Sequence, residues 1–197
     1  MKRISAIVVA LAVAVATLPT YAQTASRIRG TIVAVDATTM SLKSREGQDL
    51  VLRLADNLGV AVAKAARFED IKPGDYVGTA TMRAPNGDDV ALEVHYLAPT
   101  VPPGQIAWDL QPNARMTNAT VVSKVVGTGS HQLVLQLANG EQKVIVPEGT
   151  PIARSVPGTR ADLVPGEYVF VAAQTGADGV VTALRVQVSK DGVRPPL

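Results

Sequence analysis

Few residues of this chain have the chemistry for acid–base catalysis or metal binding. There are two histidines, His95 and His131, and no cysteine. A metal site needs three or four converging ligands, and a catalytic histidine needs a positioned partner. His95 is expected on the solvent-facing side of a strand beside Glu93, and His131 near the start of a hairpin. Both are interpreted as solvated strand residues, so no metal ligand and no catalytic residue is assigned.

Other patterns of reactive or ligating side chains are incomplete. Asn86, Asp88 and Asp89 lie close together, but they lack the alternating ligands and final glutamate of a calcium loop. No serine lies in a G-x-S-x-G motif, and no phosphate-binding glycine loop is present. We therefore expect no enzymatic activity and no cofactor. A hydrolytic enzyme is the least favoured alternative, which a buried histidine–carboxylate pair in one pocket would revive.

Trp108 is the single tryptophan, and it lies in a proline-rich segment with Asp109 directly after it. Such an aromatic residue either anchors a ligand or packs between two domains and fixes their orientation. We predict a binding site in the loops and the inter-domain groove near Trp108, Asp109, Thr117 and Asn118. The expected partner is an unknown protein, glycan or small-molecule ligand of the cell envelope.

The first residues predict export. Lys2 and Arg3 precede an apolar run at 4–18, and small residues follow up to Ala22, which is typical of a cleavable signal peptide. We therefore assign a signal peptide to residues 1–22 and expect a periplasmic protein. The apolar run is too short to span a bilayer, and no later segment is long and apolar enough, so no membrane span is expected after cleavage.

The signal also carries the excess of positive charge. Two of the 19 basic residues lie in it, which leaves 17 to balance the 17 acidic residues. A chain without net charge has no general attraction to nucleic acid or to anionic lipid. Aromatic residues for base stacking are also scarce, at 4%. Nucleic acid is therefore not expected as a partner.

The two halves of the chain are similar at a spacing of 92 residues. Residues 70–77 (D-I-K-P-G-D-Y-V) match residues 162–169 (D-L-V-P-G-E-Y-V), and residues 60–94 share eleven identities with residues 152–186. The matches fall on turn glycines and apolar strand positions, which a fold would require. We infer an internal duplication.

Each copy is predicted to contain five short strands that are rich in β-branched residues and bounded by turn residues. The predicted strands lie at 27–36, 39–44, 48–55, 75–83 and 90–97, and at 115–125, 131–138, 142–147, 167–174 and 180–188. A longer connection follows the third strand of each copy, and residues 61–68 are expected to form a short helix. A barrel of the oligonucleotide/oligosaccharide-binding (OB) type has a connection at that place, often helical.

The favoured fold is all-β, with two tandem small OB-like five-stranded barrels after the signal peptide. Two β-sandwich-like meanders are the alternative. We expect a first β-barrel module at 26–97, a proline-rich linker at 98–114, a second module at 115–190 and a C-terminal tail at 191–197. Each copy is expected to close its own apolar core.

The repeated D-[IL]-x-P-G-[DE]-Y-V motif, followed by N-G or D-G and then A-L-x-V, resembles an uncharacterised family of bacterial exported OB-like β-barrel domains. Residues 108–112 (W-D-L-Q-P) and 116–121 (M-T-N-A-T-V) are similar to a two-copy periplasmic subgroup of that family. The resemblance covers nearly all of the chain after the signal, and it implies a fold and a compartment but no particular activity.

These observations favour a non-enzymatic periplasmic binding or accessory protein of unknown ligand. The alternative is an envelope metal-handling protein, for metal binding or metal transport, that would use His95, His131 and acidic side chains.

Overall fold

A computed structural model describes residues 24–195. The predicted signal peptide at 1–22 and the last two residues of the predicted tail lie outside this range. Among the described residues, none of the helical segments has the length and apolar character needed to cross a membrane. The fold is all-β, as expected, and the helical content of residues 24–195 is two 3-10 turns of three residues each.

Twelve strands follow one another along the described chain. The first half contains β1 (Thr24–Val35), β2 (Thr39–Ser44), β3 (Asp49–Ala65), the 3-10 turn η1 (Phe68–Asp70), β4 (Tyr76–Arg83), β5 (Asp89–Tyr96) and β6 (Gly104–Ala107). The second half contains β7 (Arg115–Val125), β8 (Ser130–Leu137), β9 (Gly140–Pro147), β10 (Ile152–Pro157), the 3-10 turn η2 (Arg160–Asp162), β11 (Tyr168–Thr175) and β12 (Val181–Val188). Each of the ten predicted strands begins within three residues of its predicted start, while β6 and β10 are additional.

Several elements recur 92 residues apart. The turns η1 and η2, the strands β4 and β11, and the strands β5 and β12 each have both ends at that spacing. The β4–β5 pair has an irregularity between Ala80 and Thr81, and the β11–β12 pair has one between Ala172 and Ala173, again 92 residues later. The spacing seen in the sequence is thus also a spacing of structural elements.

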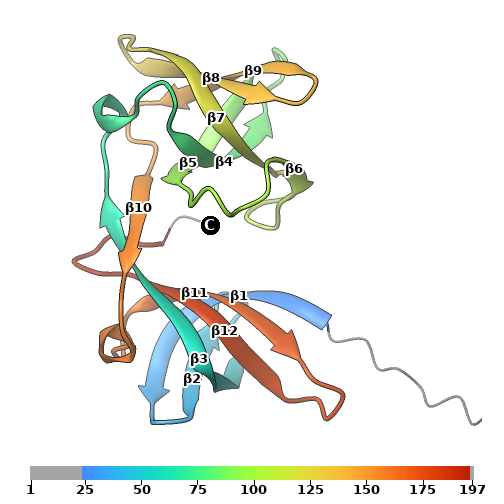
Figure 1. The fold of residues 1–197 in the computed structure, drawn as a ribbon, viewed down its shortest axis with the longest axis vertical. Helices are drawn as coiled ribbons and strands as arrows, with labels where there is room; N and C mark the ends of the chain where they lie inside the picture. The colour runs from blue at the N-terminus through green and yellow to red at the C-terminus, as the bar shows by residue number, and fades with distance from the viewer. Residues whose placement is uncertain (1–23, 196–197) are drawn as a thin grey trace, which may run out of the picture.

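The strand pairings follow two closed circuits, which lie in the upper and lower parts of Figure 1. The first ring, in the lower part, runs through β1, β2, β3, β12 and β11 and back to β1. The second ring, in the upper part, runs through β7, β8, β9, β5 and β4 and back to β7. Each circuit contains one parallel pair, β3 with β12 and β5 with β9.

The two predicted copies exchange their last two strands, which corrects the expected organisation. The first ring combines β1–β3 with β11 and β12, and the second ring combines β7–β9 with β4 and β5. The boundaries at 26–97 and 115–190 therefore do not separate the two rings. The physical reason is the length of β3, which runs on for 17 residues and carries the chain from one ring to the other.

The repeated Pro-Gly turns fix this exchange locally. Gly74 and Gly166 adopt φ angles of 92° and 93°, which lie in the left-handed region that glycine tolerates. The N–H of Gly74 donates to the carbonyl of Val121, and the N–H of Gly166 donates to that of Ile32, both at 2.8 Å. Each turn is thus bonded to the first strand of the other half.

Each ring has its own buried apolar cluster, built from both halves of the chain. The first cluster includes Ile32, Met40, Leu42, Leu52, Val169, Val171, Val186 and Val188. The second includes Ile71, Val77, Val94, Val121, Leu133, Leu135, Val144 and Val146. Neither cluster is complete without strands from the other half, so burial of apolar surface stabilises the exchanged arrangement.

The strands β3 and β10 cross between the rings. Residues 61–65 of β3 pair antiparallel with residues 153–157 of β10. The short helix expected at 61–68 is therefore wrong, because this segment stays extended up to Ala65. The β-branched Val62 favours a strand, and β10 supplies the backbone partners that an extended segment needs.

The proline-rich segment at 98–114, which we call the strap, packs against the second ring. Its strand β6 pairs antiparallel with β7, from Gly104 opposite Asn118 to Ala107 opposite Arg115. The hydroxyl of Tyr76 donates to the carbonyl of Val101 at 2.9 Å. The strap is therefore a fixed part of the fold and covers the outside of one ring.

Candidate functional site

Trp108 is buried in a small apolar cluster at the end of the strap. Its side chain is 9% exposed and packs with Ala114 of the strap and with Ala80 and Met116 of the second ring. The backbone N–H of Trp108 donates to the carbonyl of Ala114 at 2.8 Å, which closes the turn before β7. The sequence left open whether Trp108 is an exposed anchor or a packing residue, and in the structure its side chain is buried in packing contacts.

Two arginines of the first ring face the Trp108 ring. The guanidinium of Arg27 lies 4.4 Å from the ring centroid, and that of Arg29 lies 5.7 Å from it. Both residues belong to β1, where alternate side chains share one face of the strand. A cation over an indole face is an attractive contact, so Trp108 links the strap of the second ring to the first ring.

Asp109 strengthens the same link. The guanidinium of Arg29 donates to both carboxylate oxygens of Asp109, at 2.9 and 3.0 Å, and Arg45 donates to the Asp109 carbonyl at 3.2 Å. The hydrogen bonds from Arg29 hold the pKa of Asp109 below its ordinary value. The side chain of Arg29 is only 3% exposed, so this bidentate pair clamps the strap onto β1.

A cavity of about 440 Å³ lies beside Trp108, between the strap and the two rings. Its lining is mainly apolar, with charged and polar groups at a few points. The lining includes Arg27 from the first ring, His95, Met116 and Asn118 from the second ring, and Val101, Pro102, Pro103, Ile106 and Trp108 from the strap. An apolar pocket with a few convergent polar groups is the usual form of a small-molecule site.

The four residues predicted as a binding site take different positions around this cavity. Trp108 and Asn118 line it, and the amide of Asn118 donates to the carbonyl of Pro102 at 3.3 Å. Thr117 is fully buried, and its hydroxyl accepts a hydrogen bond from the Gln105 amide at 3.1 Å. Asp109 lies in the adjacent ion pair. Trp108 and Asn118 are thus cavity residues, while Thr117 and Asp109 support the structure around them.

The structure corrects the prediction for His95. Its side chain is 6% exposed and that of Glu93 is 5% exposed, with 3.4 Å between His95 Nδ1 and Glu93 Oε1. The prediction of a solvent-facing position fails because the strap covers this face of β5, and His95 lines the cavity with Val101 and Pro102. A buried histidine–carboxylate pair is therefore present beside the pocket.

Gly78 makes room for the imidazole of His95. A Cβ atom at position 78 would lie 2.5 Å from His95 Nε2 and 3.2 Å from the Asn118 side-chain oxygen. The residue 92 positions later is Phe170, so the repeated fold does not itself require a glycine at this place. The glycine is specific to the side of the molecule that carries the cavity.

Several buried polar atoms at the site have no hydrogen-bond partner. Within the described chain, Nε1 of Trp108 has none, and Nδ1 of His95 and Oε1 of Glu93 have only each other, at 3.4 Å. Unsatisfied buried polar groups are rare in folded proteins and call for an explanation such as a bound ligand or water.

The second histidine lies apart from this site. The ring of His131 stacks on Phe68 with 4.3 Å between the ring centroids, and its Nδ1 accepts a hydrogen bond from the Gly127 N–H at 3.3 Å. Across residues 24–195, no three or more histidine, aspartate, glutamate or cysteine side chains are grouped so that they could hold a metal ion. The two histidines therefore do not converge.

Sequence reasoning did not assign Arg27, Arg29, His95 or Gly78 to the site. The alternation of Arg27 and Arg29 along a predicted strand was an available signal that both share one face. The contacts of Arg27 and Arg29 were not predictable, because their partners Trp108 and Asp109 lie in the strap, about 80 residues further along the chain. Comparison with known proteins gives no further guide: no protein-family model, no curated protein and no solved structure matches this chain.

Proposed function

We propose that this protein is an exported, non-enzymatic binding protein with two OB-like barrels derived from a duplication, and that its ligand occupies the cavity beside Trp108. The proposal of export to the periplasm rests on the pattern of residues 1–22. The proposal of a duplication rests on the spacing of 92 residues that the sequence and the elements share.

The strand order of each ring supports the OB-like interpretation. When the five strands of a ring are numbered by their order within a repeat, both rings follow the circuit 1-2-3-5-4, with strands 3 and 5 parallel. A five-stranded, partly open barrel of this kind is the OB architecture. In our proposal, each barrel is completed by the fourth and fifth strands of the other repeat.

The position of Trp108 is the observation that carries the proposed binding function. Its indole N–H is buried without a partner, and its ring stands beside an apolar cavity that Arg27 reaches from the other ring. A ligand with an apolar body would displace water from the lining. An anionic group on that ligand would match Arg27, which is the formally charged side chain in the lining.

Anilinonaphthalene sulfonate is a suitable probe, because it combines an apolar body with one anionic group. We expect saturable binding that raises dye emission and quenches Trp108, the single tryptophan of the chain. Arg27→Gln is expected to weaken binding about tenfold through loss of a charge-assisted contact. Arg53→Gln is the matched control, since Arg53 is an exposed arginine of β3 outside the cavity lining.

The outcomes of this titration are distinct. Equal dye affinity in the parent protein, Arg27→Gln and Trp108→Phe would overturn the assignment of the cavity. Native mass spectrometry of protein purified under mild conditions is the complementary measurement, because a ligand retained from the cell adds a defined mass. Circular dichroism of each variant checks that the fold is intact.

Acid–base catalysis is a second candidate, favoured by one observation, the buried pair of Glu93 and His95 beside the cavity. A carboxylate that orients a histidine is a usual part of hydrolytic sites. Among the described residues, however, no hydroxyl forms a hydrogen bond with His95, so the pair lacks an activated nucleophile. Hydrolysis of a panel of nitrophenyl esters that is lost in His95→Gln, while dye binding persists, would favour catalysis over binding alone.

A further inference from the structure

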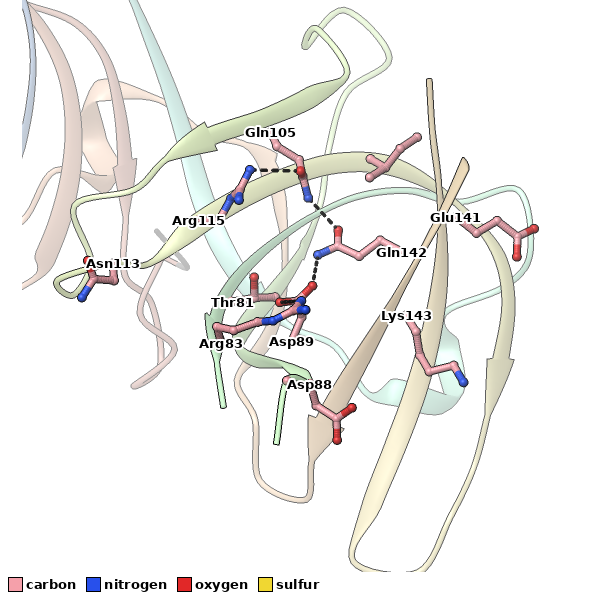
Figure 2. Close-up of a pocket in the computed structure, with 12 residues that line it drawn as sticks. Thr81, Arg83, Asp88, Asp89, Gln105, Asn113, Arg115, Glu141, Gln142 and Lys143 are labelled. Carbon is pink, nitrogen blue, oxygen red and sulfur yellow. Dashed lines mark hydrogen bonds and ion pairs between the residues drawn. The ribbon is translucent and has the colours of Figure 1, made fainter. Parts of the chain in front are cut away.

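A second and larger cavity, of about 680 Å³, lies on the second ring (Figure 2). Polar side chains reach it from five strands: Arg83 from β4, Asp89 from β5, Gln105 from β6, Arg115 from β7 and Gln142 from β9. Its lining is thus polar where that of the Trp108 cavity is mainly apolar. The different lining indicates a different class of ligand.

The side chains of this cavity form one continuous chain of hydrogen bonds, drawn as dashed lines in Figure 2. Arg115 donates to Gln105 at 3.2 Å, Gln105 donates to Gln142 at 3.1 Å, and Gln142 donates to Asp89 at 2.8 Å. Arg83 donates to the other oxygen of Asp89 at 2.9 Å. Because each member is held by its neighbour, the donors and acceptors have fixed directions before any ligand binds, which lowers the entropic cost of binding.

The repeated fold does not require these residues. At the positions 92 residues later, Arg83 is replaced by Thr175, Asp88 by Val180 and Asp89 by Val181. The first ring, which contains β11 and β12, therefore has uncharged residues at these three positions. Residues that build the shared scaffold recur in both repeats, so Arg83, Asp88 and Asp89 serve something other than the scaffold.

The charges in the lining balance. Three cations, Arg83, Arg115 and Lys143, stand with three carboxylates, Asp88, Asp89 and Glu141, and the lining contains no aromatic side chain. A balanced lining gives no net attraction for a phosphate or another free anion. The absence of an aromatic face among the lining residues also disfavours a stacked nucleobase. A neutral ligand rich in groups that both donate and accept hydrogen bonds is the remaining match.

We propose that this cavity binds a neutral, polyhydroxylated ligand, namely a segment of a glycan. A hydroxyl group both donates and accepts, so it is complementary to guanidinium and amide donors beside carboxylate acceptors. Within residues 24–195, the side chains of Glu141 and Lys143 make no hydrogen bond or ion pair, and the Arg115 guanidinium bonds only to Gln105. These groups supply contacts to the ligand, while Gln142 holds Gln105 in place and Asp89 holds Arg83.

The test is a titration of the isotope-labelled protein with chitotriose and with maltotriose, read by the side-chain amide signals of Gln105, Gln142 and Asn113. We expect one of these neutral trisaccharides to shift those signals saturably at concentrations up to about 10 mM, the range of a weak site. Gln142→Ala is expected to weaken binding about tenfold, because it releases the Gln105 amide that Gln142 holds by a hydrogen bond. Gln48→Ala is the matched control, because Gln48 is an exposed glutamine at the β2–β3 turn of the first ring.

Other results would overturn the proposal. If neither trisaccharide shifts the three amides, the cavity is not a glycan site. If inorganic phosphate shifts them and the trisaccharides do not, the cavity is an anion site. Equal weakening by Gln142→Ala and Gln48→Ala would show binding elsewhere, and thermal unfolding of both variants checks that each is folded.

Discussion

Ala63 of β3 lies directly opposite Ser155 of β10 in an antiparallel pair, and the two residues are 92 positions apart in the sequence. Each therefore faces the residue that the 92-residue spacing assigns to it in the other half of the chain. Only a two-fold relationship places equivalent positions opposite one another in this way. The crossing of β3 and β10 is thus the local axis about which the two halves of the chain exchange strands.

A cysteine pair at this axis tests the exchange. Gly158 donates to Val60 and Ala66 donates to Ile152, so hydrogen-bonded pairs alternate with pairs such as Ala63 and Ser155 that are not hydrogen-bonded. Cα atoms in the latter kind of pair lie about 4.5 Å apart, within the range of a disulfide. We expect Ala63→Cys with Ser155→Cys to form an intramolecular disulfide, detected by the mass change on reduction.

The natural chain contains no cysteine, so no other thiol of the same molecule can form a disulfide with the introduced pair. Ala63→Cys with Gln48→Cys is the control, because these positions lie near opposite ends of β3, separated by about 50 Å of extended chain at the rise of a strand. If each repeat closed its own ring instead, positions 63 and 155 would not face one another. The double variant would then keep its thiols or cross-link between molecules.

Gly78→Ala is predicted to destabilise the fold through His95. The added Cβ would meet the imidazole at 2.5 Å and would force it to move, at a cost of about 1–3 kcal/mol for overpacking a buried site. In the His95→Ala background the obstacle is gone, so Gly78→Ala should cost much less there. A double-mutant cycle by urea unfolding measures this coupling. Additive effects of the two substitutions would contradict the contact.

Asp109→Asn is predicted to loosen the strap from the first ring. It removes the charge that Arg29 contacts in a two-point geometry, with an expected loss of about 1–2 kcal/mol. Because the folded pKa of Asp109 is lowered, its stabilising contribution is present above the ordinary aspartate value and is lost as the pH falls through the folded pKa. Unfolding between pH 7 and pH 2 should therefore depend less on pH in Asp109→Asn than in the parent protein.

The turn between β1 and β2 offers a second test of pH dependence. Hydrogen bonds, the largest from the Thr39 hydroxyl, lower the pKa of Asp36 from 3.8 to about 2. The turn is thus stabilised above pH 3.8, and that stabilisation is lost as the pH falls through about 2. Thr39→Val should raise the pKa of Asp36 toward its ordinary value, measured by NMR titration of the carboxyl carbon. An unchanged pKa would refute this assignment.

The strand positions were predictable because the turns are marked in the sequence. A Pro-Gly turn precedes β4 at Pro73 and Gly74, and another precedes β11 at Pro165 and Gly166. The alternation of apolar residues then predicted the strands. The helix expected at 61–68 failed because a strand partner from the other repeat stabilises an extended backbone there. Such a partner leaves no local signal.

The exchange of strands was not predictable for a related reason. The pair β4 and β5 is similar in sequence to the pair β11 and β12, so either pair has the apolar residues to close either ring. The two halves differ instead in the segment that follows the third predicted strand. Residues 56–59 continue as strand, whereas residues 148–151 at the equivalent place contain Gly149 at positive φ and Pro151, which interrupt the strand before β10.

The candidate site was predictable only in part. Trp108 and Asn118 were indicated by residue type and position, and both line the cavity. His95 was predicted to face solvent because alternation along β5 shows two faces but not what covers them. The strap that covers His95 has no regular hydrophobic period that would predict its position. Arg27 lines the same cavity, although it belongs to β1 of the first ring, which pairs with β11.

The closure of the first ring by β11 and β12 has a consequence for how the chain is made. β1, β2 and β3 leave the ribosome first, yet their core stays open until nearly the whole polypeptide has emerged, because their closing strands come last. Pairings between such distant segments form slowly. The first hydrophobic interior is therefore sealed only when the two ends of the described chain meet, whereas the second ring closes with strands from the middle of the sequence alone.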